Sequence, residues 1–505
     1  MVKRKTVVFG FDGATWDIIN PLIKSGKMPN LARLINEGVS GILRSFEPMA
    51  SPILWTSISS GKLPDKHGVG AFLLNSNNVK CKRIWDILEE KGWSIGLSGH
   101  LLCWPPRKIN GYIIPDDTFS KGVETYPEEL SFIRKLAEAK RRNKLGTKEY
   151  LYYLKECLSH GISITNLLKG FGLSIRSKFD KNQSFLDSFY KIRGIRDVFR
   201  RDLFFALDKK YNPDYSFYYT NLADACSHLY WKYMEPEKYK DVPADEIKKF
   251  RNIIKNSYME ADKFLGKLLE RADDDWTICV VSDHGFKAAD VSEEGWLYSV
   301  KTEFFSELLG ISDKVVGYNL GPSAILKFKD KYKDEMDHYA ELIEKITFAE
   351  SGQKVFTTFS DEFGVHCAVD EKTGDNRDRG IVFPGKDGIS FDDIVESSTR
   401  INGVHHIEGI LVLKGPDVEA GKIINGASVM DITPTLLALS GIEVGKDMDG
   451  KVLTDAINPD FLIENPVQYI DTHESAEKTE MEENDEDDGY SENIKEKLRA
   501  LGYLE

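Results

Sequence analysis

The sequence of 505 residues lacks several features that define large classes of protein. Its six cysteines are scattered with no Cys-x-x-Cys pair, which argues against a disulfide framework and against a cysteine-based zinc site. No apolar run approaches the roughly 18 residues of a membrane-spanning helix. The basic start of the chain leads into an apolar run that is too short for the core of a signal peptide. We therefore expect a cytoplasmic protein.

An excess of positive charge is also lacking. The chain has 67 Lys+Arg against 81 Asp+Glu, a net charge of −14, which argues against a stable nucleic-acid partner. The charge is unevenly distributed, because residues 134–201 contain 17 basic and six acidic residues, whereas residues 474–488 contain nine acidic residues and one lysine. Hydrophobic residues make up 41% of the chain, which excludes a wholly disordered protein.

Apolar segments typical of buried strands alternate with helical patterns. Strands are predicted over 5–11, 41–45, 93–98, 215–219, 276–281 and 410–413, and helices over 28–37, 53–59, 84–91, 244–271 and 431–440. This alternation predicts a parallel α/β sheet with right-handed crossovers. Such sheets bind ligands beyond the carboxyl ends of their strands. Asp12 and the pair Asp283-His284 directly follow predicted strands, which is the first indication of a functional site.

Two long segments interrupt this alternation. Residues 121–204 are charged, amphipathic and helical, and we interpret them as a basic helical insert that forms a cap or lid. Residues 290–400 form a second insert of mixed pattern. We therefore assign residues 1–120 and 205–470 to one α/β domain. Residues 471–505 are predicted to be an acidic, flexible tail with a short terminal helix.

Residue types that bind divalent metals gather at strand ends and in short loops. They are Asp12, Ser51, Asp224, His228, Asp283, His284 and His405. Carboxylates combined with imidazoles suit zinc, and mixed oxygen and nitrogen sets also suit manganese. Each of these residues or pairs, taken alone, has a simpler explanation. Ser51 could cap the helix that follows it, and Asp224 with His228 could be a surface pair one helical turn apart.

Taken together, the motifs resemble the alkaline phosphatase superfamily, and within it the type I phosphodiesterase/nucleotide pyrophosphatase-like branch. The matching blocks are Phe-Asp-Gly at 11–13, the segment 51–69 with Gly-Lys-Leu-Pro-Asp-Lys-His-Gly at 61–68, Asp-Ala-Cys-Ser-His at 224–228, Ser-Asp-His-Gly-Phe at 282–286, Gly-Val-His at 403–405, Met-Asp-Ile-Thr-Pro-Thr at 430–435 and Asp-Met-Asp-Gly at 447–450. Their order and spacing agree with the family over about residues 1–120, 205–290 and 400–455. The sulfatase branch is disfavoured, because Ser51 is followed by Pro-Ile-Leu-Trp and the arginine of the sulfatase motif is missing.

The resemblance implies a three-layer α/β sandwich with a central, mostly parallel sheet, and it implies roles for the residues. Asp12, Asp283 and His284 match the ligands of one divalent metal ion. Asp224, His228 and His405 match the ligands of a second, and both ions are expected to be Zn²⁺, with Mn²⁺ as the alternative. Ser51 matches the metal-bound nucleophile that forms a phospho-enzyme. Many phosphodiesterase-type relatives have threonine there, so the serine weakens a choice between monoesterase and diesterase.

The implied function is a metal-dependent phosphohydrolase that cleaves a phosphodiester or a phosphoanhydride. The substrate is expected to be a small phosphate ester or anhydride, either a nucleotide or a lipid-linked compound. One alternative is a phosphomonoesterase or a phosphotransferase of the phosphoglycerate mutase type. Another is a non-catalytic protein that binds a phosphate ligand on the same scaffold. The sequence does not fix the oligomeric state.

Two further residues and the basic insert enter these expectations. His100 is a candidate substrate-binding residue, and His67 is interpreted as a residue that shapes a glycine-rich turn. Three interpretations of the basic insert stay open. The first is a solvated helical face, the second is a surface that gathers phosphate-rich substrate, and the third is a peripheral contact with an anionic membrane.

Overall fold

The fold was analysed in a computed structural model. The structure describes residues 3–69, 75–116, 122–141, 147–179, 185–239, 242–289, 297–320, 323–361, 364–369, 379–398 and 402–474. Beyond residue 474, the predicted acidic tail and its terminal helix lie outside the described residues. No helix in the described ranges has the length and apolar character needed to cross a membrane.

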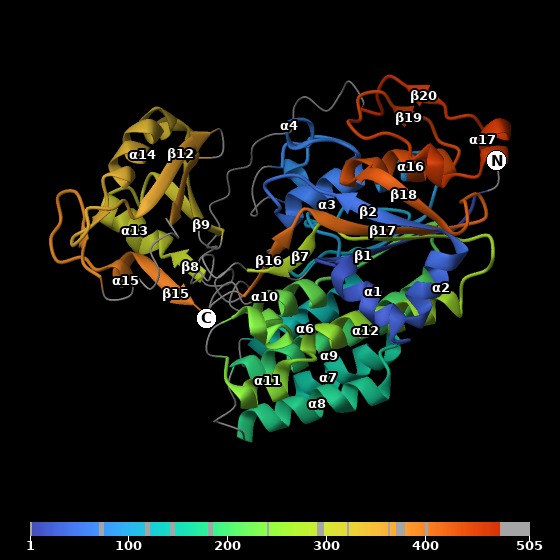
Figure 1. The fold of residues 1–505 in the computed structure, drawn as a ribbon, viewed down its shortest axis with the longest axis horizontal. Coiled ribbons are helices and arrows are strands. Elements are labelled where there is room, and N and C mark those ends of the chain that lie inside the picture. The colour runs from blue at the N-terminus through green and yellow to red at the C-terminus, as the bar shows by residue number, and fades with distance from the viewer. Residues whose placement is uncertain are drawn as a thin grey trace.

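An eight-stranded sheet forms the centre of the main body (Figure 1). Its strands, in spatial order, are β18 (Lys422–Ser428), β2 (Val39–Arg44), β17 (Glu408–Lys414), β6 (Thr277–Val281), β1 (Thr6–Phe11), β5 (Tyr215–Thr220), β3 (Ile95–Ser98) and β4 (Gly111–Ile114). All neighbouring pairs are parallel except those of β17, which runs antiparallel to both β2 and β6. The predicted mostly parallel α/β sheet is therefore confirmed.

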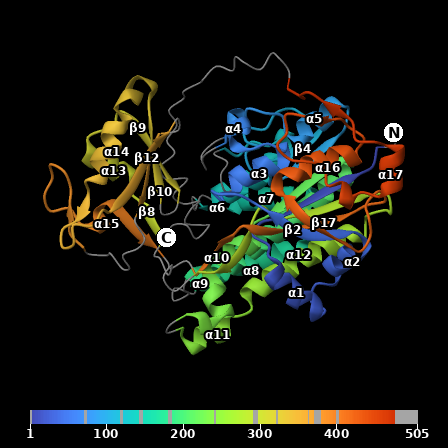
Figure 2. The same cartoon turned by 45° about the horizontal axis from the view of Figure 1, so that its top comes forward.

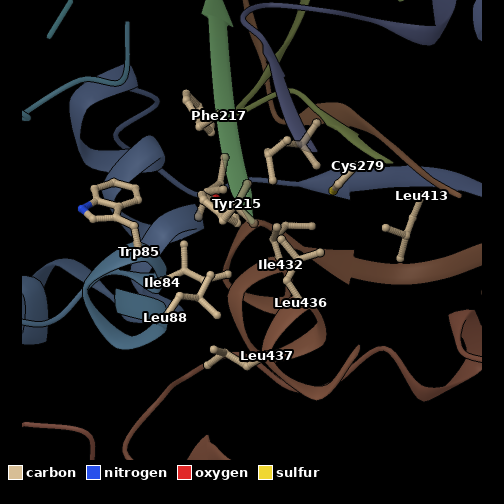
Figure 3. Close-up of a cluster of buried hydrophobic side chains, with 14 of the residues drawn as sticks. Ile84, Trp85, Leu88, Tyr215, Phe217, Cys279, Leu413, Ile432, Leu436 and Leu437 are labelled. Atoms are coloured by element: carbon tan, nitrogen blue, oxygen red, sulfur yellow. The ribbon is translucent and has the colours of Figure 1, made fainter. Parts of the chain in front are cut away.

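Helices cover both faces of this sheet and make three layers. One face carries α3 (Ser51–Ser60), α4 (Pro64–His67), α5 (Ile84–Glu90) and α16 (Ile432–Leu439), and the other carries α1 (Trp16–Lys24), α2 (Pro29–Glu37), α9 (Phe185–Tyr211), α10 (Leu222–Met234) and α12 (Ile253–Leu269). Strand β5 shows why both faces are apolar, since Tyr215 and Phe217 pack into one core and Tyr218 into the other. Figure 3 shows the first of these cores, between the sheet and helices α5 and α16.

The predicted basic insert is helical in its described parts. It contains α6 (Phe132–Arg141), α7 (Thr147–Ser159), α8 (Ile164–Phe179) and most of α9. Helix α9 continues past the predicted boundary at residue 204 because Phe204 and Leu207 on its last turns are buried beside strands of the sheet. The helix predicted over 244–271 is divided by a turn at residues 251 and 252 into α11 (Ala244–Phe250) and α12.

A second lobe is built from residues 297–398, within the predicted mixed insert, and stands beside the main body (Figures 1 and 2). It contains β8 (Leu297–Val300), α13 (Thr302–Leu309), β9 (Val315–Leu320), β10 (Ser323–Phe328), α14 (Met336–Glu344), β11 (Thr347–Phe348), β12 (Phe356–Asp361), β13 (Gly364–Val369), β14 (Ile381–Val382), α15 (Phe391–Ile394) and β15 (Val395–Ser398). Its buried residues form a core of their own. The lobe is inserted between two paired antiparallel strands, β7 (Gly285–Ala288) and β16 (Gly403–His406).

The C-terminal described residues close the main body. They form α17 (Pro459–Glu464) and the short pair β19 (Val444–Gly445) and β20 (Tyr469–Ile470). Glu474 accepts a hydrogen bond at 2.9 Å from Nζ of Lys62, which follows α3. All six cysteines are free and buried, in agreement with the absence of a disulfide framework.

Candidate active site

The ends of neighbouring strands place several of the predicted site residues at one edge of the sheet. Asp12 follows β1, and Asp283 with His284 follows the neighbouring strand β6. The backbone N–H of Asp12 donates to the carbonyl of Thr220 at the end of β5, at 3.1 Å. Because β1, β5 and β6 are parallel, their carboxyl ends lie side by side.

The first group surrounds the Ser51 hydroxyl. His284 Nε2 lies 3.5 Å from Ser51 Oγ, 3.5 Å from Asp12 Oδ1 and 3.5 Å from Asp283 Oδ2. Ser51 is the first residue of α3, and the capping position is taken by Ala50, whose side chain makes no capping hydrogen bond. The simpler explanation of Ser51 as a helix cap is therefore wrong, and its hydroxyl faces the Asp and His side chains.

The second group comes from α10 and β16. His228 Nε2 lies 3.5 Å from Asp224 Oδ1, His405 Nε2 lies 3.4 Å from the same oxygen, and the two Nε2 atoms are 3.1 Å apart. Asp224 and His228 are both buried, so the interpretation as a surface pair is wrong. The rings of His284 and His405 stack with centroids 3.6 Å apart, which joins the two groups into one site.

Each of the three imidazoles is held by its other nitrogen. The Nδ1 atoms of His228, His284 and His405 lie 3.0, 3.1 and 2.9 Å from the backbone carbonyl oxygens of Gly403, Gly285 and Met49. A carbonyl oxygen only accepts, so Nδ1 carries the proton in each ring, and the neutral tautomer leaves a lone pair on Nε2. This is the arrangement in which metal-binding histidines are usually held.

Carboxylate oxygens that accept no hydrogen bond lie opposite these Nε2 lone pairs. Asp12 Oδ1, Asp224 Oδ1 and both oxygens of Asp283 are buried and accept no hydrogen bond from any described residue. Buried acceptors without a donor are costly, and a lone pair on Nε2 facing a carboxylate oxygen is repulsive unless a cation lies between them. The donor set therefore fits divalent metal ions. Two groups of three have all ligand atoms within 4.8 Å of one another: Asp12 with Asp283 and His284, and Asp224 with His284 and His405.

Burial and mutual repulsion shift the pKa values of these carboxyls. Burial raises the pKa of Asp12 well above its ordinary value, and the charges of Asp283 and Asp224 add to this effect. Burial raises the pKa of Asp283 to about 6. Burial also raises the pKa of Asp224, but without a metal ion the adjacent His228 and His405, when they are protonated, outweigh it and hold that pKa well below its usual range. An added cation would favour the ionised form of all three carboxyls.

One residue of the site escaped the sequence analysis. The hydroxyl of Tyr219, the penultimate residue of β5, donates a hydrogen bond to Asp12 Oδ2. Tyr219 is buried and leaves only Oδ1 of Asp12 without a donor. An aromatic residue in a strand is ordinarily read as core, and the partner is 207 residues away in the chain. No signal in the sequence pointed to this contact, because it depends on β1 and β5 being neighbours in the sheet.

His100 is not brought into this cluster. Its ring is buried among aromatic rings, with centroids 4.5 Å from both Trp85 and Phe217. Its Nδ1 lies 2.7 Å from the carbonyl of Leu101, and burial lowers its pKa to about 3. Its predicted contact with substrate stays a prediction, and in this structure the residue is part of the core.

His67 has the structural role expected from the sequence. Its Nε2 lies 3.0 Å from Ser57 Oγ, and its Nδ1 accepts a hydrogen bond from the backbone N–H of Val69 at 3.1 Å. The second contact places a proton on Nε2, which therefore donates to Ser57. Together they hold the turn at Gly68, where φ is 73° and glycine is favoured.

Comparison with known proteins identifies the family of this chain. The sequence profile of the type I phosphodiesterase/nucleotide pyrophosphatase family matches residues 6–373, which includes every predicted site residue except His405. No curated protein matches the sequence significantly.

Solved structures with a similar arrangement include human ectonucleotide pyrophosphatase/phosphodiesterase 5, at 13% identity and a TM-score of 0.46, over 90% of this chain and 100% of that one. An inactive variant of the murine protein in complex with AMP matches at 13% identity and a TM-score of 0.47, with the same coverage. A second murine structure matches at 14% identity and a TM-score of 0.44, over 87% of this chain and 95% of that one.

Proposed function

The chain belongs to the type I phosphodiesterase/nucleotide pyrophosphatase family, a family of phosphoric ester hydrolases, and we propose that it uses Ser51 and two divalent metal ions to cleave a phosphodiester or phosphoanhydride. One observation carries this proposal. Imidazole Nε2 atoms and carboxylate oxygens without hydrogen-bond donors converge beside the Ser51 hydroxyl.

The ligands divide into two sets. Asp12, Asp283 and His284 would hold the ion next to Ser51. Asp224, His228 and His405 would hold the other, with His284 in contact with both sets through its stacked ring. When bound, two divalent cations would lower the pKa of the serine hydroxyl and stabilise the negative charge of the phosphoryl group and the leaving oxygen. Zn²⁺ is the first expectation for such Asp/His ligands and Mn²⁺ the second.

The chain supplies the nucleophile and its position. Ser51 Oγ attacks phosphorus, the bond from phosphorus to the leaving oxygen breaks, and the phosphoryl group stays on the serine. Ser51 stands at the start of α3, where its own backbone N–H would bind a phosphate oxygen, because Pro52 has no N–H and those of Ile53 and Leu54 donate to the Ala50 carbonyl. Water then attacks phosphorus and releases Ser51.

Replacement of the serine tests this proposal directly. Ser51→Ala should reduce the kcat for bis-p-nitrophenyl phosphate by about 10³-fold or more, because it removes the hydroxyl that would attack phosphorus. Metal content, measured by mass spectrometry of the purified protein, should stay near two ions per chain. Ser25→Ala, an exposed serine at the end of α1, is the matched control. Unchanged turnover in Ser51→Ala would refute the role of Ser51.

The preference for diester over monoester needs its own measurement. We propose the diesterase, and its kcat/KM for bis-p-nitrophenyl phosphate should exceed that for p-nitrophenyl phosphate. A strong preference for the monoester would favour a phosphomonoesterase. Bound metal without hydrolysis across a phosphoester panel would favour a binding protein. Chelation followed by addition of single divalent ions would identify the metal.

We further propose that the helical insert rests on an anionic membrane surface, which would suit a lipid-linked phosphate substrate. Exposed apolar side chains gather on it: Leu151 and Tyr152 on α7, and Ile164 and Leu168 one turn apart on α8. Lys155 and Lys169 are exposed in the same helices. Apolar side chains flanked by lysines are typical of a helix that lies in a membrane interface.

Vesicle sedimentation tests the membrane contact. The protein should sediment with phosphatidylglycerol vesicles more than with phosphatidylcholine vesicles, and less as salt is raised. Replacement of Ile164 and Leu168 by serine should abolish sedimentation. Replacement of Ile423 and Ile463, which are equally exposed elsewhere, should not. Equal loss in both double variants would contradict a specific face.

A further inference from the structure

Asn402 is a buried polar residue at the point where the chain re-enters the main body from the second lobe, directly before β16. Its backbone N–H donates to the carbonyl of His228 at 2.9 Å, and its Nδ2 donates to the carbonyl of Leu229 at 3.0 Å. Its Oδ1 accepts from the backbone N–H of Lys232 at 2.9 Å. These hydrogen bonds tie the residue to one turn of α10.

The contact differs from an ordinary helix end. The carbonyl of residue 228 and the N–H of residue 232 are partners of each other in a regular α-helix, and α10 continues to Met234. The carbonyls that lack helical partners are those of the last four residues of a helix, which are 231–234 here. Asn402 therefore does not end the helix. Its hydrogen bonds instead fix the position of β16 relative to this turn of α10.

The residue after Asn402 allows a close approach between β16 and α10. A Cβ atom on Gly403 would lie 2.2 Å from the carbonyl oxygen of Ser227, so only glycine fits at this position. The Gly403 carbonyl oxygen lies 3.0 Å from Nδ1 of His228 and orients that ring. His405, another proposed ligand, follows two residues later on the same strand. The segment 402–405 therefore connects one turn of α10 with two ligands of the second metal ion.

The two sets of ligands are supported differently. Asp12 and Asp283 follow β1 and β6, which are paired neighbours in the eight-stranded sheet. Strand β16 lies outside that sheet and pairs with β7 in a separate two-stranded ladder. The distance between His405 and the two ligands on α10 is set across a contact between a strand and a helix. The hydrogen bonds of Asn402 lie in that contact.

We propose that Asn402 is a positioning residue for the second metal ion. It holds β16 against α10, so that His228 and His405 present their Nε2 atoms to the same ion as Asp224. The two Nε2 atoms are 3.1 Å apart, and a displacement of β16 would change this geometry. The inference rests on the two-metal site of the proposed function, and it adds a residue that acts through two of the ligands.

Metal titration of the full chain tests this role. Asn402→Ala removes both side-chain hydrogen bonds to α10 and leaves that of the backbone N–H. After chelator treatment, competition with a chromogenic chelator for Co²⁺ should show that one of two ions is bound about 10- to 100-fold more weakly. The affinity for the other ion should not change. Equal weakening of both ions would overturn the role, because it would indicate a general loss of structure.

A double-mutant cycle identifies the ion that is affected. His228→Ala removes a ligand of the second set and leaves the ion held by Asp12, Asp283 and His284. Addition of Asn402→Ala to this variant should not weaken the binding of the remaining ion, because the two residues act on the same, second ion. The visible absorption of the Co²⁺-loaded protein reports the remaining ion directly. A further loss of affinity would overturn the proposal, since Asn402 would then act on the first ion.

Two further variants separate positioning from stability. Asn402→Asp keeps an oxygen for the Lys232 N–H but replaces the donor to the Leu229 carbonyl, so it should weaken the same ion and serves if Asn402→Ala does not fold. Asn30→Ala breaks a hydrogen bond of 3.1 Å to the Asp262 carbonyl, between α2 and α12, which carry none of the proposed ligands. Both ions should bind to Asn30→Ala as they do to the wild type. An equal loss there would overturn the role of Asn402.

Turnover keeps this inference separate from the proposed activity. If the wild type binds two ions and hydrolyses no phosphoester, while Asn402→Ala loses one ion, the proposed function fails and the role of Asn402 stands. If the wild type hydrolyses a phosphodiester and Asn402→Ala binds both ions equally tightly, the role of Asn402 fails alone. Binding of fewer than two ions by the wild type would overturn both.

Discussion

In each of the three site histidines, a single backbone contact determines which ring nitrogen faces the site. Each Nδ1–H is held by a carbonyl that its own loop or a neighbouring element supplies, and Met49, which holds His405, immediately precedes Ala50 and Ser51. The loop that orients one ligand is therefore the loop that positions the nucleophile. Displacement of this loop would disturb both at once.

The Tyr219 hydroxyl offers a prediction at this scale. Tyr219→Phe removes the donor to Asp12 Oδ2 and leaves that oxygen without its hydrogen bond. We expect a loss of metal affinity of about 10- to 100-fold, as for other residues that support metal ligands. The affinity is measured by competition with a chromogenic chelator. Tyr215→Phe, at the start of the same strand, is the control, and equal loss in both variants would refute the specific role of Tyr219.

Protonation of the buried carboxyls predicts a pH dependence. The pKa of Asp283 is raised by burial to about 6, and that of Asp12 is also raised, so their ionised forms destabilise the metal-free fold as pH rises above the unfolded value near 4. Bound cations remove this penalty. The increase in Tm on addition of Zn²⁺ should therefore grow between pH 5 and pH 7, as measured by scanning fluorimetry. A pH-independent increase would contradict this account.

Among the elements, helix α2 depends on a neighbour for its N-terminus. Its capping position is Met28, whose side chain makes no hydrogen bond to the helix. Asp262 on α12 takes over this role, with Oδ1 accepting from the Leu31 backbone N–H at 2.8 Å and Oδ2 accepting from Asn30 Nδ2 at 2.8 Å. The contact joins two helices of the same layer.

Removal of this cap should destabilise the main body. Asp262→Ala should lower the free energy of unfolding by about 1–3 kcal/mol, because a backbone N–H loses its buried acceptor. Urea denaturation measures the change. Lys263→Ala, next to it on the exposed side, should be close to neutral. A neutral Asp262→Ala would show that the cap is replaced by water.

The same elements show what the sequence could predict. Central strands such as 5–11 and 276–281 are continuous apolar runs that end in a carboxylate, so both the strands and the site edge were predictable. The turn at residues 251 and 252 was not, because no proline or glycine marks it. The burial of Arg193 was also hidden, since it depends on how α9 packs against its neighbours. Contacts between distant segments, such as Tyr219 with Asp12, leave no local pattern.

In the whole molecule, the described residues on either side of the second lobe lie next to each other. The backbone N–H of Ala289 donates to the carbonyl of Asn402 at 3.1 Å, so the chain leaves and re-enters the main body at adjacent positions. The lobe also has a core of its own. Segments with these two properties can usually be removed from their host.

Excision of the lobe is the test at this scale. A chain in which a short Gly/Ser linker replaces residues 290–401 should fold, with far-ultraviolet circular dichroism that retains the helices of the main body. It should bind metal with the affinity of the full chain, because every proposed ligand lies outside the excised segment. A folded but metal-free product would show that the lobe positions the ligands around β7 and β16.

The reactivity of the six buried thiols can report the local opening of each part of the protein. Cys157 lies in the helical insert, Cys367 in the second lobe, and Cys81, Cys103, Cys226 and Cys279 in the main body. A thiol shielded from solvent reacts with an alkylating reagent only when its surroundings open. Pulsed alkylation read by peptide mass spectrometry would therefore time the opening of each part in the unmodified chain, without introduced labels.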